Sequence, residues 1–289
     1  GSAIFAGGLI KKAIFADNLA PVVERLYNQP DALDFTLSWL ATTGFGMQIY
    51  LDFSGYSEMA LGLAWMLGIR LPRNFLYPYI SRNFSEFWTR WHITLSQWLR
   101  DYLYISLGGS RCSQGRTYFN LMTTMVLGGL WHGAGWNFVF WGFLHGSYLI
   151  IYHALSSLYH RLGWRTGTLP GNLLSWIGWP VTFILTSFTW VFFRAPSFDQ
   201  AWTISGAMLG LVQPEGPLAT IRLYETVLIL CSFALVMVEP IVVRLMQRAG
   251  VEWWWRLVPF PLRGAAYASL VLVVLVLGGE TQKFIYFDF

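Results

Sequence analysis

The chain has 289 residues, of which 55% are hydrophobic, 18% aromatic and 12% charged, and its formal net charge is +4. Soluble domains carry about 25% charged residues, so this chain has roughly half the usual supply of water-facing side chains. This composition excludes a disordered segment, a coiled coil and an ordinary cytosolic enzyme. It predicts an all-α, polytopic transmembrane protein.

The first candidate span lies near residues 37–60. Before it, Gly7-Gly8 followed by Lys11-Lys12 is typical of a chain leaving the membrane. Within it, residues 52–58 place two carboxylates in an apolar stretch, and an intramembrane carboxylate is costly unless it is paired or lines a wet cavity. Asp52 is therefore expected either to line a cavity or to lie in an interfacial loop.

Residues 84–103 predict an amphipathic helix that is interfacial or re-entrant. Its charged residues lie off an aromatic stripe, and His92 lies at the edge of that stripe, about 80° from its centre. The stripe repeats at helical spacing and consists of Phe84, Phe87, Trp88, Trp91, Leu95, Trp98, Leu99 and Tyr102.

Further spans follow from the long stretches without charge. No Asp, Glu, Lys or Arg occurs in residues 117–160 or in residues 166–193, and a bilayer core takes about 20 helical residues. With the first span, these stretches and two later apolar windows predict about six spans. The five further spans lie near 117–131, 136–158, 173–193, 224–245 and 264–280.

Arginines are densest in residues 70–116, which we therefore place on the cytoplasmic side. Because the basic residues are scattered, they suit anionic lipid better than nucleic acid. The group comprises Arg70, Arg73, Arg82, Arg90, Arg100, Arg111 and Arg116.

His132 is the most informative single residue. It lies in a charge-free window among glycines, which permit close helix packing or a broken helix. An ionisable residue there is functional by default, although a histidine hydrogen-bonded between two helices is the alternative. His145 fits packing or hydrogen bonding, and no metal site is predicted because the window holds no cysteine or carboxylate.

Three blocks of sequence closely resemble the membrane-bound O-acyltransferase superfamily, in particular its bacterial alginate O-acetyltransferase branch. The Lys11–Ala20 run KKAIFADNLA and the closing FIYFDF look like the same branch. The blocks are DFSGYSEMALGLAWMLGIRLPRNFLYPY (52–79), FSEFWTRWHITLSQWLRDYLYISLGGSR (84–111) and GGLWHGAGWNFVFWGFLHG (128–146).

The resemblance implies a single membrane domain over 1–289 that lacks the family's N-terminal part. It implies a multi-pass protein of the bacterial inner membrane that acetylates an exported polysaccharide through an extracytoplasmic partner. In this family the histidine of the WHG motif, here His132, is the proposed catalytic residue, and His92 is the second histidine that the bacterial members share.

We hypothesise that His132 is a general base acting on a thioester donor, most simply acetyl-CoA, with no bound cofactor. Arg100, Arg111 and Arg116 are expected to meet the donor's phosphates. Hydrogen bonding from His92 or Asp101 is expected to fix the imidazole tautomer. Trp131 and Asp52 complete the residues predicted for donor binding or the cavity.

Tyr286, in the closing aromatic run, has two interpretations. Composition alone favours an aromatic belt that anchors the last helix. The resemblance implies an acyl relay, in which the phenol accepts the acetyl group and passes it to an extracytoplasmic partner.

Several alternatives remain at the level of sequence. The same fold acylates other acceptors, such as cellulose or peptidoglycan, or transfers D-alanine to teichoic acid. A transporter or channel would carry a repeated pair of broken half-helices, which the sequence does not indicate. In a structural scaffold, His132 would be replaceable without loss.

Overall fold

A computed structural model describes residues 1–163, 169–214, 216–250, 255, 257–280 and 282–284, and no strand occurs among them. The chain divides into two compact units. The first comprises Gly1–Leu26, Thr43–Pro72 and Thr220–Asp288, and the second comprises Tyr27–Thr42 and Arg73–Ala219.

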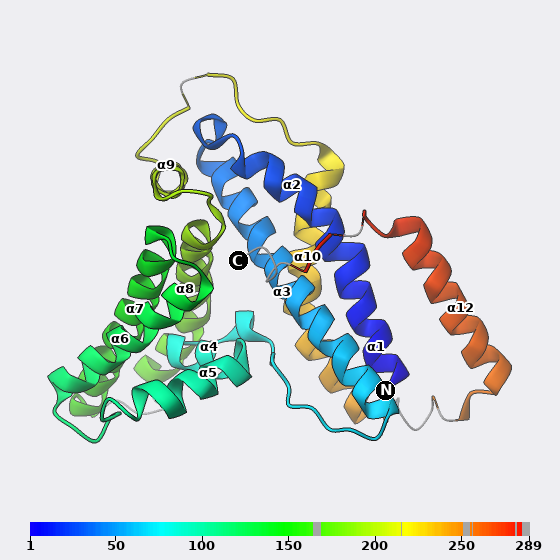
Figure 1. Cartoon of the computed structure of the whole chain (residues 1–289), viewed down its shortest axis with the longest axis horizontal. Coiled ribbons are helices and arrows are strands. Elements are labelled where there is room, and N and C mark those ends of the chain that lie inside the picture. Colours follow the sequence, from blue (N-terminus) through cyan, green and yellow to red (C-terminus); the bar gives the residue numbers. More distant parts are fainter. Residues whose placement is uncertain (164–168, 215, 251–254, 256, 281, 285–289) are drawn as a thin grey trace. The chain divides into compact units, whose positions relative to one another are not determined.

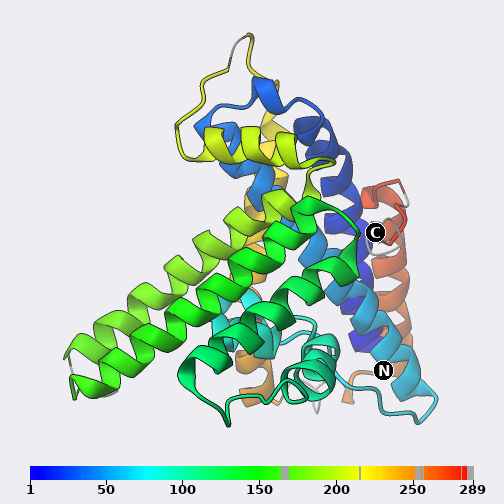
Figure 2. The same ribbon diagram turned by 60° about the vertical axis from the view of Figure 1, so that its left-hand side comes forward.

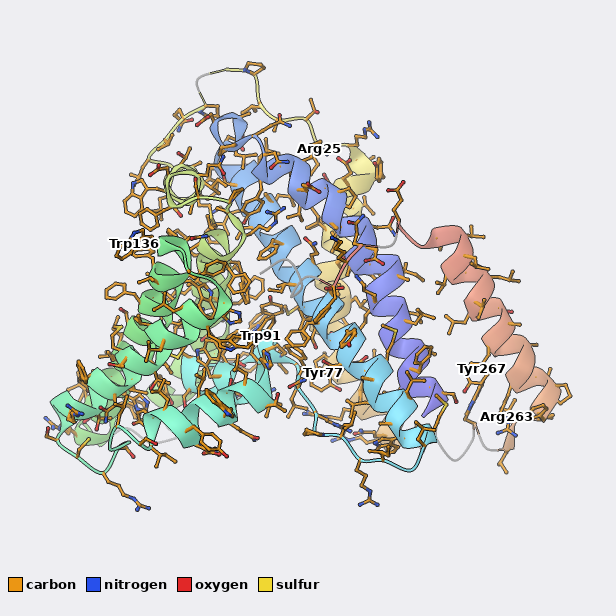
Figure 3. The ribbon with its side chains drawn as sticks, viewed as in Figure 1. Arg25, Tyr77, Trp91, Trp136, Arg263 and Tyr267 are labelled. Carbon is orange, nitrogen blue, oxygen red and sulfur yellow. The ribbon has the colours of Figure 1, made fainter. Side chains whose placement is uncertain are left out.

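The first unit is a group of long helices in which the α1–α2 run lies beside α3 and α10 (Figure 1). Ser2 Oγ and the Tyr267 hydroxyl lie 3.0 Å apart and link α1 to α12, the outermost helix of this unit (Figure 3). Its elements are α1 (Ser2–Leu9), the π-helix η1 (Ile10–Ala16), α2 (Asp17–Tyr27), α3 (Phe35–Met66), α10 (Leu223–Arg248) and α12 (Phe260–Leu277).

Glycines bring the backbones of α1 and α3 into direct contact. A Cβ atom added at Gly8 would collide with the Gly55 carbonyl oxygen, and one added at Gly55 would lie 2.7 Å from the Gly8 carbonyl oxygen. The two helices pack antiparallel, since Gly62 approaches Gly1 in the same way. Close packing of this kind is common between helices in membranes.

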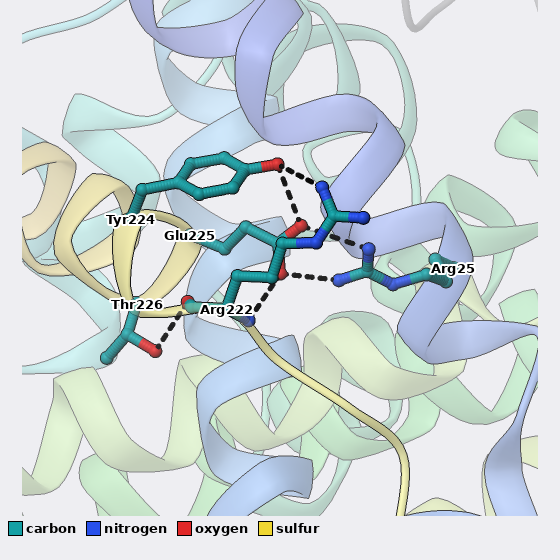
Figure 4. A network of polar contacts seen from close by, with 5 residues as sticks. All are labelled: Arg25, Arg222, Tyr224, Glu225 and Thr226. Carbon is teal, nitrogen blue, oxygen red and sulfur yellow. Dashed lines mark hydrogen bonds and ion pairs between the residues drawn. The ribbon is translucent and has the colours of Figure 1, made fainter.

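A half-buried ion pair connects α2 to the start of α10 (Figure 4). The Arg25 guanidinium donates two hydrogen bonds to the Glu225 carboxylate, at 3.0 and 2.6 Å. The same carboxylate accepts the backbone N–H of Arg222 at 2.8 Å, which caps the first turn of α10.

The second unit is built on α6, α7 and α8, which lie side by side (Figure 2). Its most completely buried side chains are aromatic, among them Trp91, Trp141 and Trp190. Its elements are η2 (Pro30–Ala32), η3 (Pro78–Ile80), α4 (Phe84–Arg90), α5 (Ile93–Trp98), the π-helix η4 (Leu99–Tyr104), α6 (Gln114–His132), α7 (Trp136–Arg161), α8 (Leu169–Arg194) and α9 (Phe198–Met208).

The all-helical membrane fold is confirmed, but six spans are not. Each predicted span coincides with a helix, yet only four helices in the described part of the chain are long and apolar enough to cross a membrane by themselves. The other two, α3 and α6, carry charged or amide side chains that lower their hydropathy. The four are Trp136–Tyr159, Trp176–Arg194, Leu223–Arg248 and Phe260–Leu277.

Candidate active site

His132 is the last residue of α6, where Gly133 ends the helix. The side chain is 7% exposed, and its Nδ1 atom is buried. Three aromatic rings surround the imidazole: those of Trp131, Trp141 and Phe193 have centroids 4.9, 5.5 and 5.0 Å from it. An apolar surrounding of this kind favours the neutral imidazole, which is the form that accepts a proton.

Glycines around His132 permit close helix packing, as the sequence predicts. A Cβ added at Gly129 would collide with the Phe138 carbonyl oxygen, and one added at Gly142 would collide with that of Met125. The backbones of α6 and α7 are therefore in contact just before α6 ends. This contact sets where His132 stands relative to Trp141 on α7.

His92 lies at a break in the predicted amphipathic helix. A continuous helix over 84–103 is wrong, because the chain there forms α4, α5 and η4, with His92 in the left-handed conformation at φ 41° between the first two. Long-range hydrogen bonds hold the break open. The Ile93 N–H donates to the Asn74 carbonyl at 2.9 Å, and the Thr94 hydroxyl donates to the Asn74 side chain at 2.6 Å.

The break brings His92 to His132. Trp131 contacts both rings, with centroids 6.5 Å from the His92 ring and 4.9 Å from the His132 ring. The histidines are near enough that a positive charge on His92 disfavours one on His132. Burial lowers the pKa of His92 to about 4, so this ring is also neutral at pH 7.

His145 is a hydrogen-bonding residue of the core. It is fully buried, and its Nε2 lies 3.0 Å from the Thr189 hydroxyl oxygen. That hydroxyl donates its own proton to the Thr186 carbonyl at 2.7 Å. His145 Nε2 is therefore the donor, and the ring packs 4.7 Å from Trp141.

The residues predicted for donor binding in the second unit are solvent-accessible. Trp131 is 57% exposed. Arg111 and Arg116 are also exposed. Arg100 is paired instead with Asp101, through hydrogen bonds of 2.7 and 3.1 Å, so the Asp101 carboxylate is held by its neighbour.

Asp52 and Tyr286 differ from the other candidates. Asp52 belongs to the first unit and lies inside α3, 3% exposed and paired with Lys12 at 2.6 Å. The interfacial-loop interpretation of Asp52 is therefore wrong. Tyr286 lies outside the described residues.

The sequence analysis missed the ion pairs of the lysines in η1. Lys11 bonds to Glu58 at 2.6 Å and also to Glu239, and it is 7% exposed. The membrane exit expected at Lys11 and Lys12 stays a prediction. The available signal was the pair of carboxylates inside a predicted span, because buried carboxylates need cationic partners.

Comparison with known proteins gives one family match, over residues 2–193, to the membrane-bound O-acyltransferase family. The chain is 46% identical over 208 residues to the protein named "Probable alginate O-acetylase AlgI" of Azotobacter vinelandii. That alignment covers 72% of this chain and 40% of the relative.

Two other relatives carry different names. The "Peptidoglycan O-acetyltransferase" of Helicobacter pylori is 41% identical over 211 residues, covering 73% of this chain and 39% of the relative. The "Teichoic acid D-alanyltransferase" of Streptococcus thermophilus is 37% identical over 115 residues, covering 37% of this chain and 28% of the relative. The chain thus matches about 40% of the length of its most similar curated relatives.

Proposed function

The chain belongs to the membrane-bound O-acyltransferase family, and we propose that it is the histidine-bearing part of an inner-membrane O-acetyltransferase that acts on alginate or a similar exopolysaccharide. The observation that carries this proposal is the pair His92 and His132. These residues, 40 positions apart in the sequence, both contact the ring of Trp131. Their surroundings keep both imidazoles neutral.

In the proposed reaction, His132 is the general base. It takes the proton of an attacking hydroxyl while the oxygen forms a bond to the acyl carbon of a thioester. The carbon–sulfur bond then breaks, and the imidazolium returns the proton to the leaving thiolate. General-base catalysis of this kind supplies about 10²–10⁴-fold. His92 acts as a positioning residue. Because its ring is neutral, it does not repel the positive charge that forms on the imidazolium of His132.

The donor is a cytoplasmic acyl thioester, most simply acetyl-CoA. Exposed Arg111 and Arg116 suit its phosphates, because a guanidinium forms paired hydrogen bonds with phosphate oxygens. Arg100 is less available for this role, because its guanidinium already binds Asp101. Exposed Trp131, next to His132, suits the acyl or pantetheine part of the donor.

The acceptor is alginate or a similar polymer, reached through an extracytoplasmic acetyltransferase partner. The relatives support this choice, because the names with the highest identities refer to alginate. Peptidoglycan and teichoic acid are the alternatives that other relatives carry in their names.

Tyr286 completes the proposal as an acyl relay that passes the acetyl group from the donor to the partner. Incubating the full-length parent protein with acetyl-CoA should add one acetyl group, as intact mass detects. The adduct should be absent from Tyr286→Phe. An adduct that persists in Tyr286→Phe removes the relay.

The central test is the acetyl content of secreted polymer in cells that carry variants of the full-length parent. His132→Ala should lower it about 10²-fold or more, in line with the loss of a general base. His153→Ala is the matched control, since His153 is exposed on α7 and should behave as wild type. Wild-type acetylation by His132→Ala at normal protein levels would refute the proposed function.

A further inference from the structure

Lys12 lies at the centre of a buried set of polar contacts in the first unit. Its Nζ atom lies 2.7 Å from Asp17 Oδ1, 2.6 Å from Asp52 Oδ1 and 3.1 Å from the Gln282 carbonyl oxygen. Two of these contacts are hydrogen bonds, to Asp17 and Gln282, and the contact with Asp52 is an ion pair. One acceptor is a backbone group near the C-terminal end of the described chain.

Gln282 is held through its backbone carbonyl, which accepts a hydrogen bond from Lys12 Nζ at 3.1 Å. A neighbouring β-strand would satisfy such a carbonyl, and here a lysine takes its place. Because the contact is to the main chain, it holds the segment without regard to the side chain at position 282.

The residues on either side of Gln282 are also fixed to the same helices. The Gly279 N–H donates to the Ala13 carbonyl at 3.0 Å, and a Cβ added at Gly279 would lie 2.9 Å from the Asn18 nitrogen. At the other end, the Phe284 ring stacks on Tyr56 at 4.5 Å and meets Phe53 edge-on at 5.3 Å. Gly279, Gln282 and Phe284 thus each contact the helices of the first unit.

The neighbouring Lys11 is buried by contacts with acidic side chains. Burial of a lysine in η1 therefore does not by itself depend on the C-terminal segment. Lys11 lies in the same π-helix, is more deeply buried than Lys12, and bonds to Glu58 and Glu239. Its bonding partners are acidic side chains, whereas Lys12 adds a main-chain partner. π-Helical turns occur frequently at functional sites, and this one presents two successive lysines to different partners.

We propose that Lys12 is a main-chain clamp that positions residues 278–280 and 282–284 for acyl transfer at Tyr286. The part of this inference that concerns Tyr286 rests on the proposed relay. Lys12 is a positioning residue, because it acts on the chain and not on donor or acceptor. The relay tyrosine follows Phe284 by two positions, so the clamp acts on it through a short length of chain.

The clamp is tested by spin labelling of the full-length parent protein in nanodiscs. Lys283 is exposed and lies between the clamped residue and Phe284, so Lys283→Cys accepts a nitroxide in a Cys112→Ser, Cys231→Ser background. The spectrum should be that of an immobilised label. Lys12→Met should abolish most of the immobilised component, whereas the matched control Lys11→Met should retain it.

Gly279→Val provides a second variant that leaves the charges intact. Its added side chain would collide with the backbone of Asp17 and Asn18, so it should mobilise the label in the same way as Lys12→Met. An unchanged, immobilised label in both variants overturns the clamp.

A second measurement separates the clamp from the relay. If the relay operates, Lys12→Met should slow the formation of the acetyl adduct on Tyr286 at least tenfold, and Lys11→Met should slow it much less. If wild type forms no adduct while Lys12→Met still mobilises the label, the clamp stands and the relay fails. An adduct that forms at equal rates in the wild type and Lys12→Met overturns the positioning role.

Discussion

His92 combines a backbone role with a chemical one. Its left-handed conformation turns the chain between α4 and α5, and its ring faces Trp131 beside His132. Asn is the side chain, apart from Gly, that best tolerates this conformation, whereas β-branched residues do not. His92→Asn therefore removes the imidazole while keeping the turn, which makes it a sharper variant than His92→Ala.

The pKa of His92 predicts how stability depends on pH. The pKa is about 4 in the folded chain and 6.5 when unperturbed. Between these values the unfolded chain binds the proton and the folded chain does not, so the free energy of unfolding falls as the pH drops. The loss from this residue is at most about 3 kcal/mol at pH 4.

Thermal unfolding in detergent between pH 4.5 and 7.5 measures this effect. His132 and His145 are also buried and contribute to the slope, so the relevant quantity is the difference between wild type and His92→Asn. The variant should lose less stability on acidification. Equal slopes for the two proteins would contradict the burial of a neutral His92.

At the scale of the elements, the close contact between α6 and α7 near the site leaves no room for an added side-chain atom. Gly129→Ala should destabilise the protein, because the methyl group would collide with the Phe138 carbonyl oxygen and force the helices apart. We expect a cost of about 1–3 kcal/mol and lower acetylation, since His132 follows three residues later.

Gly115 offers a control in the same helix. A Cβ there meets nothing within 4 Å, so Gly115→Ala should be neutral or stabilise α6 by up to about 1 kcal/mol. Thermal unfolding of both variants measures the comparison. A Gly129→Ala protein as stable as Gly115→Ala would show that the helices do not pack this closely.

The helices were predictable where local pattern determines them. Long uncharged stretches located α7, α8 and α12, because helix length and hydropathy depend on neighbouring residues alone. The break at His92 was not predictable, since Asn74, which holds it, is distant in sequence. The ion pairs of Lys11 were not predictable for the same reason, because its partners Glu58 and Glu239 lie 47 and 228 positions away.

The candidate site was predicted in a different way. His132 stood out because it is ionisable within a charge-free, glycine-rich window, and the fold places it among aromatic rings. His92 carried only a weak signal from periodicity, and the family motif was needed to single it out. No pattern in the sequence indicated that Trp131 contacts both rings.

At the scale of the whole molecule, the placement of residues 70–116 on the cytoplasmic side stays a prediction. Cys112 lies in this stretch and is exposed, whereas Cys231 lies in the apolar helix α10. With Cys231→Ser as the background, a membrane-impermeant maleimide should label Cys112 in inverted vesicles and not in intact spheroplasts. Labelling in spheroplasts would reverse the orientation.

The Cys112→Ser variant, which keeps only Cys231, serves as the control for that measurement. Cys231 lies within a helix long and apolar enough to cross a membrane, and a membrane-impermeant reagent does not enter the bilayer core. Cys231 should therefore react slowly from either side until detergent dissolves the membrane.

The antiparallel contact between Gly8 and Gly55 determines where Lys11 and Glu58 lie along the helix axes. Lys11 and Glu58 each follow one of these glycines by three residues, so each charge lies one helical turn beyond that contact. With no side chain between the two backbones, one helix cannot slide past the other without separating from it. The level of the lysine–carboxylate pairs along the helix axis is thus set by two residues that carry neither charge nor side chain.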